Sequence, residues 1–212
     1  KPTDYGLYFQ WGDTHGYTAE QVGKDKKFEW SVYKRYYKWA GCQNFTKYTI
    51  EGAKLDLEDD AAHVNMGGSW HMPTPEQIQE LIDNTTSEWT TLDGEDGRLF
   101  TSRKDESKFI FIPAAGNAGS GLLNNNKRIG SIWSSILGIY SFYYGQRLYF
   151  DSVGAYSISS APRYGGLSVR GVIDSKQDNN DNANINKENE AMMDKYNSLK
   201  AFDNEIENLQ EK

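Results

Sequence analysis

Apolar residues recur at helical spacing in two stretches of the first half of the chain. The first stretch, residues 56–68 (DLEDDAAHVNMGG), opens with acidic residues that suit a helix N-terminus; Asp56 is the expected cap, and Gly67 ends the helix. The second stretch, residues 73–86 (PTPEQIQELIDNTT), opens with a capping box followed by an apolar face. The cap and the apolar face of this second helix are formed by Thr74, Pro75, Gln77, Ile78, Leu81 and Ile82.

The later part of the chain shows short apolar and aromatic runs divided by Gly, Asn, Asp and Pro, a pattern typical of short strands and loops. The predicted strands are residues 97–101, 109–112, 132–134, 146–150, 155–159 and 167–172. Two early helices followed by small antiparallel strands with long loops predict an α+β fold.

The composition changes once, near Asp174. The residues that follow are polar (DSKQDNNDNANINKENE) and too poor in apolar groups to offset the entropy of ordering. An amphipathic helix is predicted beyond them, with one apolar stripe formed by Met192, Tyr196, Leu199, Phe202, Ile206 and Leu209. We therefore expect one globular domain over residues 1–173, then a polar linker and helical tail over residues 174–212. We favour a tail that docks or frays, and a short oligomerising coil is the alternative.

The net charge of −7 argues against a protein that neutralises nucleic-acid phosphates or a basic membrane surface. No apolar run approaches the roughly 20 residues that span a bilayer, so membrane insertion is not expected. Aromatic residues make up 14% of the chain, so its contacts must depend heavily on rings, which bury a large area and often carry a polar tip.

Four carboxylates form the densest candidate metal site: Asp56, Glu58, Asp59 and Asp60. Calcium prefers several oxygen ligands from one loop, although this spacing differs from that of an EF-hand. First-turn acidic residues also stabilise a helix without any ion. We expect no cofactor, and a structural calcium ion is the alternative.

Motifs for catalysis are missing. Cys42 is the single cysteine and has no adjacent histidine, which favours a small apolar filler over a nucleophile. His15, His63 and His71 lack the close helical spacing of a zinc motif, so structural histidines are expected. No serine lies in a G-x-S-x-G elbow, and no glycine-rich loop has a phosphate-binding setting. The sequence therefore predicts a protein that is not an enzyme.

Several motifs in order along the chain resemble the FISUMP-type major paralogous domain, which has a C-type lectin-like fold. They are DYGLYFQWGD (residues 4–13), LEDDAAHVNMGGSWHMPTPEQIQELI (57–82), IFIPAAG (110–116), IWSS (132–135) and RYGGLSVRGV (163–172). The resemblance implies two helices packed on small antiparallel sheets within residues 1–173.

Within that group the chain is most similar to the variable proteins of diversity-generating retroelements, in which template Asn codons are mutated at their adenines. Residues 134–172 contain no Lys, Glu, Met or Trp, four of the residue types that such mutation cannot produce. Gln146 is the one exception in that segment and is expected to be fixed. The resemblance thus implies a diversified face, rich in Tyr, Ser and Gly, of the kind that antibody binding loops use.

The resemblance implies that this face contacts a cell-surface protein or glycan ligand. The candidate contacts are Ile139, Tyr140, Ser141, Phe142, Tyr143, Tyr144, Arg147, Tyr149, Ala155, Tyr156, Ser159, Ala161 and Tyr164. The expected scaffold consists of Trp11, Trp70, Pro73, Trp133, Val169 and Arg170. Arg170 is expected to pair with a buried carboxylate, because an unpaired buried charge is costly.

The resemblance also implies an extracellular location, on a bacterial surface or a phage virion. Three other functions are alternatives to adhesion. Formylglycine-generating enzymes share the broad fold but use two cysteines, where this chain has only Cys42. A calcium-dependent sugar lectin would carry an E-P-N, Q-P-D or W-N-D motif, and none is present. A structural pilin or phage tail component stays open.

Overall fold

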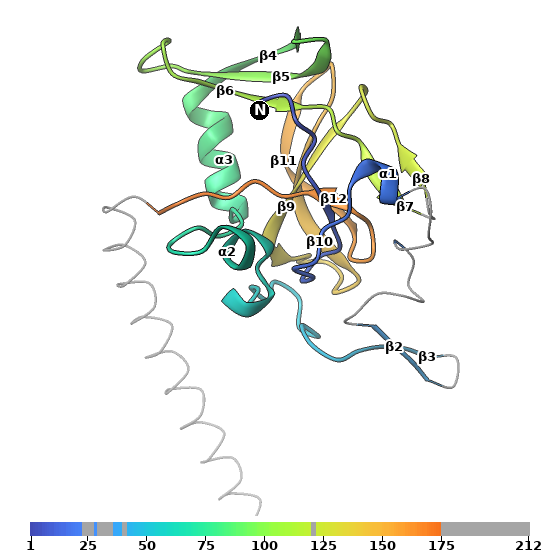
Figure 1. The fold of residues 1–212 in the computed structure, drawn as a ribbon. Helices are drawn as coiled ribbons and strands as arrows, with labels where there is room; N and C mark the ends of the chain where they lie inside the picture. The colour runs from blue at the N-terminus through green and yellow to red at the C-terminus, as the bar shows by residue number, and fades with distance from the viewer. Residues whose placement is uncertain (23–27, 29–35, 40–41, 120–121, 175–212) are drawn as a thin grey trace, which may run out of the picture. The chain divides into compact units, whose positions relative to one another are not determined.

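A computed structural model of the chain describes residues 1–22, 28, 36–39, 42–119 and 122–174 (Figure 1). The chain separates into two compact units, Lys1–Val172 and Ile173–Lys212. Only residues 173 and 174 of the second unit are described. The predicted linker and amphipathic tail therefore lie outside the described residues.

The central sheet has five of the described strands, in the order β1-β12-β9-β10-β11. Its strands are β1 (Tyr8–Phe9), β9 (Gly130–Leu137), β10 (Tyr144–Phe150), β11 (Ala155–Pro162) and β12 (Leu167–Ser168). The pairs within it are antiparallel except for β12 with β9, which is parallel. Because β1 pairs with β12, the two ends of the first unit meet in one sheet (Figure 1).

Three smaller antiparallel sheets accompany this sheet. β4 (Thr85–Leu92), β5 (Glu95–Ser102) and β6 (Phe109–Pro113) form one of them. Asp93 and Gly94 join β4 to β5 and both have positive φ, 49° and 83°, as a tight hairpin turn requires. Two hairpins complete the set: β2 (Tyr36–Trp39) with β3 (Cys42–Phe45), and β7 (Asn117–Gly119) with β8 (Leu122–Asn124).

The α+β prediction is confirmed: the two expected helices are present as α2 (Ala61–Met66) and α3 (Pro75–Asn84). A short α1 (Ala19–Val22) and a 3-10 turn, η2 (Leu57–Asp59), accompany them. The capping box of α3 is confirmed, with Thr74 accepting from the Gln77 amide and Gln77 accepting from the Thr74 amide.

The predicted cap of the first helix is wrong. Asp56 precedes the η2 turn and makes no side-chain capping bond. Asp60 caps α2 instead, because its carboxylate accepts from the amides of Ala62 and His63. The same buried carboxylate also accepts from the Met72 amide, which fixes the chain that leads into α3. The predicted stop at Gly67 is confirmed, since Gly67 has a φ of 73°.

The six predicted strands correspond to β5, β6, β9, β10, β11 and β12. The last is shorter than predicted, because regular pairing ends at Ser168 and only an isolated bridge joins His71 to Val172. The sequence interpretation missed β1, β2, β3, β4, β7 and β8.

Two tryptophans form the centre of the first core cluster. Trp11 and Trp133 are fully buried, as predicted for the scaffold. The Trp11 indole donates to the Ser134 carbonyl at 2.9 Å, and the Trp133 indole donates to the Phe9 carbonyl at 2.7 Å. Each ring therefore ties the N-terminal segment to β9 while satisfying its own polar atom.

A second core cluster lies between α3 and the sheets. Ile78 of α3 packs against Phe100, Leu148 and Phe150 in this cluster. Elements β5, β9, β10 and β11 all contact α3, so one short amphipathic helix covers strands from two sheets (Figure 1). None of the described helices has the length and apolar character that crossing a bilayer would need.

Candidate ligand-binding face

The candidate contacts begin in the loop that joins β9 to β10. This loop is held by its own backbone: Gly138 donates to the Tyr144 carbonyl at 2.7 Å, and Tyr144 donates to the Ser141 carbonyl at 3.2 Å. The Gly138 carbonyl also accepts from the Gly52 amide. The side chains of the loop are therefore presented from a defined backbone.

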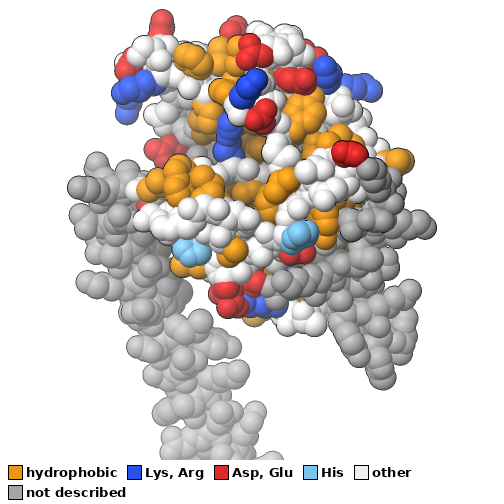
Figure 2. Space-filling view, in the orientation of Figure 1, with side chains coloured by type: hydrophobic (Ala, Val, Ile, Leu, Met, Phe, Trp, Pro, Cys, Tyr) orange, Lys and Arg blue, Asp and Glu red, His pale blue; other side chains and the backbone are white. Residues whose placement is uncertain are grey.

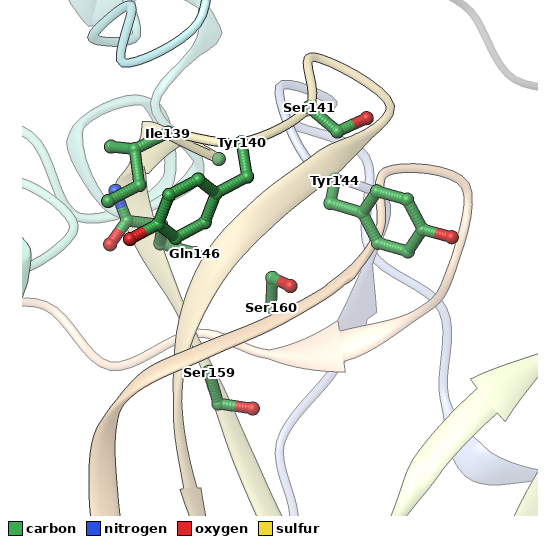
Figure 3. A pocket seen from close by; sticks show the side chains of 8 residues that line it. Ile139, Tyr140, Ser141, Tyr144, Gln146, Ser159 and Ser160 are labelled. Carbon is green, nitrogen blue, oxygen red and sulfur yellow. The ribbon is translucent and has the colours of Figure 1, made fainter.

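A pocket of about 310 Å³ opens beside this loop (Figure 3). Tyr140 is 87% exposed and Tyr144 is 41% exposed, although both rings are large and mostly apolar. Figure 3 shows loop residues and the start of β10 on one side of the pocket and β11 serines on the other. The lining consists entirely of uncharged residues: Gly138, Ile139, Tyr140, Ser141, Tyr144, Gln146, Ser159 and Ser160.

Two of the residues beside the pocket are fixed by packing. Gln146 is buried and donates from Nε2 to the Leu137 carbonyl at 3.1 Å, which fits its expected role as a constant position. A Cβ atom at Gly145 would lie 2.6 Å from the Trp11 ring, so only glycine fits there. The pairing of β10 with β9 shifts register at this point, which allows two successive residues to be buried.

The outer face of β10 and β11 carries a second group of candidate contacts. The Arg147 guanidinium carbon lies 5.0 Å from the Tyr149 ring centroid, and the Tyr149 and Tyr156 rings stack at 6.2 Å. Arg147 also donates to the hydroxyls of Ser131 and Ser159. Burial lowers the pKa of Arg147. Tyr156 is 47% exposed, so this stack ends at the surface.

The remaining candidate contacts are packed rather than free. Phe142 and Tyr143 stack on each other at 4.7 Å, and both meet the Phe45 ring edge-on. Ala161 is buried in the first core cluster, so its prediction as a surface contact is wrong. Ala155 packs partly against the second cluster. Tyr164 is half-buried, and its carbonyl accepts from Gln10.

The largest omission of the sequence interpretation is Arg163. This side chain is completely buried, and its guanidinium donates to the carbonyls of Lys47, Tyr48 and Phe142. Its guanidinium carbon also lies 4.3 Å from the Phe45 ring centroid. Arg163 therefore connects residues 47–48 to the loop that carries Phe142, and so holds the backbone of the candidate face from the buried side.

The expected scaffold residues take different positions. Pro73 is buried, as Trp133 is, whereas Trp70 and Val169 are half-buried. The predicted carboxylate partner of Arg170 is wrong, because the hydrogen bond of this guanidinium is made to the Phe111 carbonyl, at 3.5 Å.

The acidic cluster contains a cation of the protein itself. Lys47 Nζ lies 2.6 Å from Asp56, 3.0 Å from Glu58 and 2.8 Å from Asp59. Tyr48 donates to Asp59 as well, at 2.6 Å. Hydrogen bonds from the ammonium, first to Asp56, raise the pKa of Lys47. Asp56, Glu58 and Asp59 are close enough together to hold one metal ion, but the Lys47 ammonium lies between them. The fourth predicted ligand, Asp60, caps α2 instead.

The histidines make local contacts. His63 Nδ1 lies 3.2 Å from the Trp70 carbonyl, and His71 Nδ1 lies 2.8 Å from the Met72 carbonyl. The His15 ring meets the Tyr17 ring edge-on at 4.7 Å. These contacts agree with the structural role that was predicted.

A groove of about 530 Å³ adjoins Tyr149 and includes residues that the sequence did not single out. Trp89 of β4 and the basic residues Lys127 and Arg128 line it together with the turn between β10 and β11. The buried Arg98 holds that turn, because it donates to the Asp151 carbonyl at 2.8 Å. Trp89 lies on β4 and the two basic residues lie between β8 and β9, so residues this far apart in the chain give no local sequence signal.

Comparison with known proteins gave no match: no family model, curated protein or solved structure matches the chain. The resemblance to the FISUMP-type domain therefore rests on the motifs within residues 4–172. The case for a function rests on those motifs and on the geometry of the described residues.

Proposed function

We propose that the chain is a binding module, not an enzyme, that displays a diversified surface on a C-type lectin-like scaffold and recognises a cell-surface protein or glycan. The observation that carries this proposal is the pocket beside the β9–β10 loop. Exposed Tyr140, Tyr144 and Ile139 surround it, and all three belong to the segment with the restricted residue alphabet. Clustered exposed rings on a globular protein usually mark an interaction site.

The chemistry of the lining suits recognition. Tyrosine offers a large, stiff contact area with a polar tip, and the serine hydroxyls can donate or accept. Charged groups are missing from the lining, so contacts would depend on shape and hydrogen bonds. The fixed positions support the same role, because Gly145 and Gln146 hold the backbone while neighbouring side chains are free to vary.

The predicted location, on a bacterial surface or a phage virion, follows from this function and stays a proposal. The mixed fold, with α2 and α3 before a series of small sheets, supports the C-type lectin-like architecture. A calcium-dependent sugar site gains no support, since Lys47 fills the acidic cluster.

Binding of tetramers of the chain to a panel of intact bacterial cells and to an array of defined glycans tests the proposal. We expect at least one surface to bind the wild-type tetramer. Replacing both Tyr140 and Tyr144 by alanine should reduce that binding at least about tenfold, because these rings are the exposed anchors. The matched control is Phe109→Ala, which removes an exposed ring outside the segment and should bind as the wild type does. Equal binding by all three proteins would contradict the proposal.

A further inference from the structure

A third pocket, of about 430 Å³, lies among the N-terminal residues, the end of α2 and the strands β6, β9 and β12. It shares no lining residue with the pocket of the β9–β10 loop. Its wall includes Met66, Trp70, Ile132, Val169 and Arg170. On the face shown in Figure 2, hydrophobic side chains lie close to basic and acidic ones below the three-stranded sheet.

The wall is mainly apolar, and its backbone packs closely against its side chains. Gly171 brings the backbone against two of its side chains: a Cβ there would lie 2.7 Å from Met66 Sδ and 3.1 Å from the Trp70 ring. Met66 is exposed, although methionine is an apolar and adaptable residue. The half-buried Trp70 indole and the exposed Met66 thioether therefore offer a surface against which an apolar group can pack.

Polar residues also line this pocket, Lys1, Asp4, Ser168 and Arg170 among them, and Arg170 is the one that lies beside Val169 and Gly171 in the apolar wall. Its guanidinium has five donor N–H groups, and the described structure gives it one long hydrogen bond, to the Phe111 carbonyl at 3.5 Å. Burial lowers the pKa of Arg170. The Asp4 carboxylate lines the same pocket but forms no ion pair with Arg170 among the described residues. A partly desolvated cation is stabilised when a carboxylate meets it with good geometry.

We propose that this pocket binds a small carboxylic acid whose apolar part is an aryl or branched alkyl group. The carboxylate accepts two parallel hydrogen bonds from the Arg170 guanidinium, which arginine can provide and lysine cannot. The apolar group lies against Trp70 and Met66. The pocket volume falls within the range of small-molecule sites. The pocket shares no residue with the candidate contacts of the proposed adhesive face, because Val169 and Arg170 lie within residues 134–172 but belong to the expected scaffold.

Ligand-observed NMR with phenylacetate tests this proposal, and the uncharged phenylacetamide is its control. We expect the wild-type protein to bind phenylacetate, and to bind phenylacetamide at least about tenfold more weakly. Arg170→Met should remove the preference for the acid, and Arg170→Lys should retain only part of it. The matched control is Arg128→Met, which removes an exposed arginine that lines a different pocket. The Trp70 indole resonance should shift on binding.

Three results would overturn the proposal: no binding of phenylacetate to the wild-type protein, equal binding of the acid and the amide, or unchanged binding in Arg170→Met. Phenyl phosphate is the further probe, and a preference for it would overturn the assignment to carboxylates. The comparison of acid with amide uses the wild-type protein, so it decides the question even if Arg170→Met does not fold.

Discussion

The guanidinium carbon of Arg163 lies 5.0 Å from the ring centroid of Trp11, and both side chains are fully buried. This relationship joins residues that are far apart in sequence. The Trp11 indole in turn donates to Ser134, at the start of the segment with the restricted alphabet. The buried side chains of Arg163 and Trp11 therefore hold the backbone beneath the candidate face.

Replacing Arg163 by methionine should destabilise the fold by about 3 kcal/mol, because three carbonyl oxygens lose a buried donor. Denaturant unfolding measures the change. Arg128→Met is the control and should stay within about 0.5 kcal/mol of the wild type, as expected for an exposed residue. Similar free energies of unfolding for the two variants would contradict the role given to Arg163.

Trp133→Ala should cost about 3–5 kcal/mol, since a fully buried ring is removed and its bond to the Phe9 carbonyl is lost. The matched control is Phe109→Ala on β6, where the ring is exposed and the expected change is below about 0.5 kcal/mol. Thermal unfolding of both variants checks this prediction. A small loss for Trp133→Ala would mean that the tryptophan pair is not the centre of the core.

Two adjacent tyrosines should respond differently. Tyr144→Ala is expected to change stability by less than about 0.5 kcal/mol, because that ring is exposed. Tyr143→Ala should cost about 1 kcal/mol or more, since its ring stacks on Phe142 and meets Phe45. Chemical unfolding of the two variants distinguishes them. Equal effects would show that the ring cluster around Phe45 contributes nothing to stability.

Calcium should leave the melting temperature of the wild-type protein unchanged, because the Lys47 ammonium already occupies the position between the three carboxylates that an ion would take. Lys47→Met leaves these like charges together, which is unfavourable until a cation binds. This variant should therefore melt lower in chelator and recover when calcium is added. Calorimetry in both conditions is the measurement, and a calcium-dependent rise for the wild type would contradict the account.

The sequence predicts those features that depend only on residues close together in the chain. The capping box at Thr74 and the stop at Gly67 depend on backbone groups within a few residues, and both are present. The Asp93–Gly94 turn that follows β4 has an equally local signal, a D-G pair between β-prone residues, from which this hairpin could have been predicted.

Positions that depend on distant residues could not be predicted. Asp60 rather than Asp56 caps α2, because the Asp60 carboxylate also binds the Met72 amide across the fold. The buried state of Arg163 depends on carbonyls more than a hundred residues earlier in the chain. Some candidate contacts are exposed and others are buried, and this difference also depends on distant residues. Strand alternation and the register shift of β10 against β9 decide which side chains point outward.

The central claim is that the exposed positions of residues 134–172 are diversified from a template. Sequencing the DNA that flanks the coding region is the most direct test. We predict a near-copy of this segment beside a reverse transcriptase gene, with Asn codons opposite exposed positions such as Tyr140, Tyr144 and Tyr156 and identical codons opposite the buried Gly145 and Gln146. The absence of such a copy, or mismatches that fall mainly at the buried positions, would contradict the account.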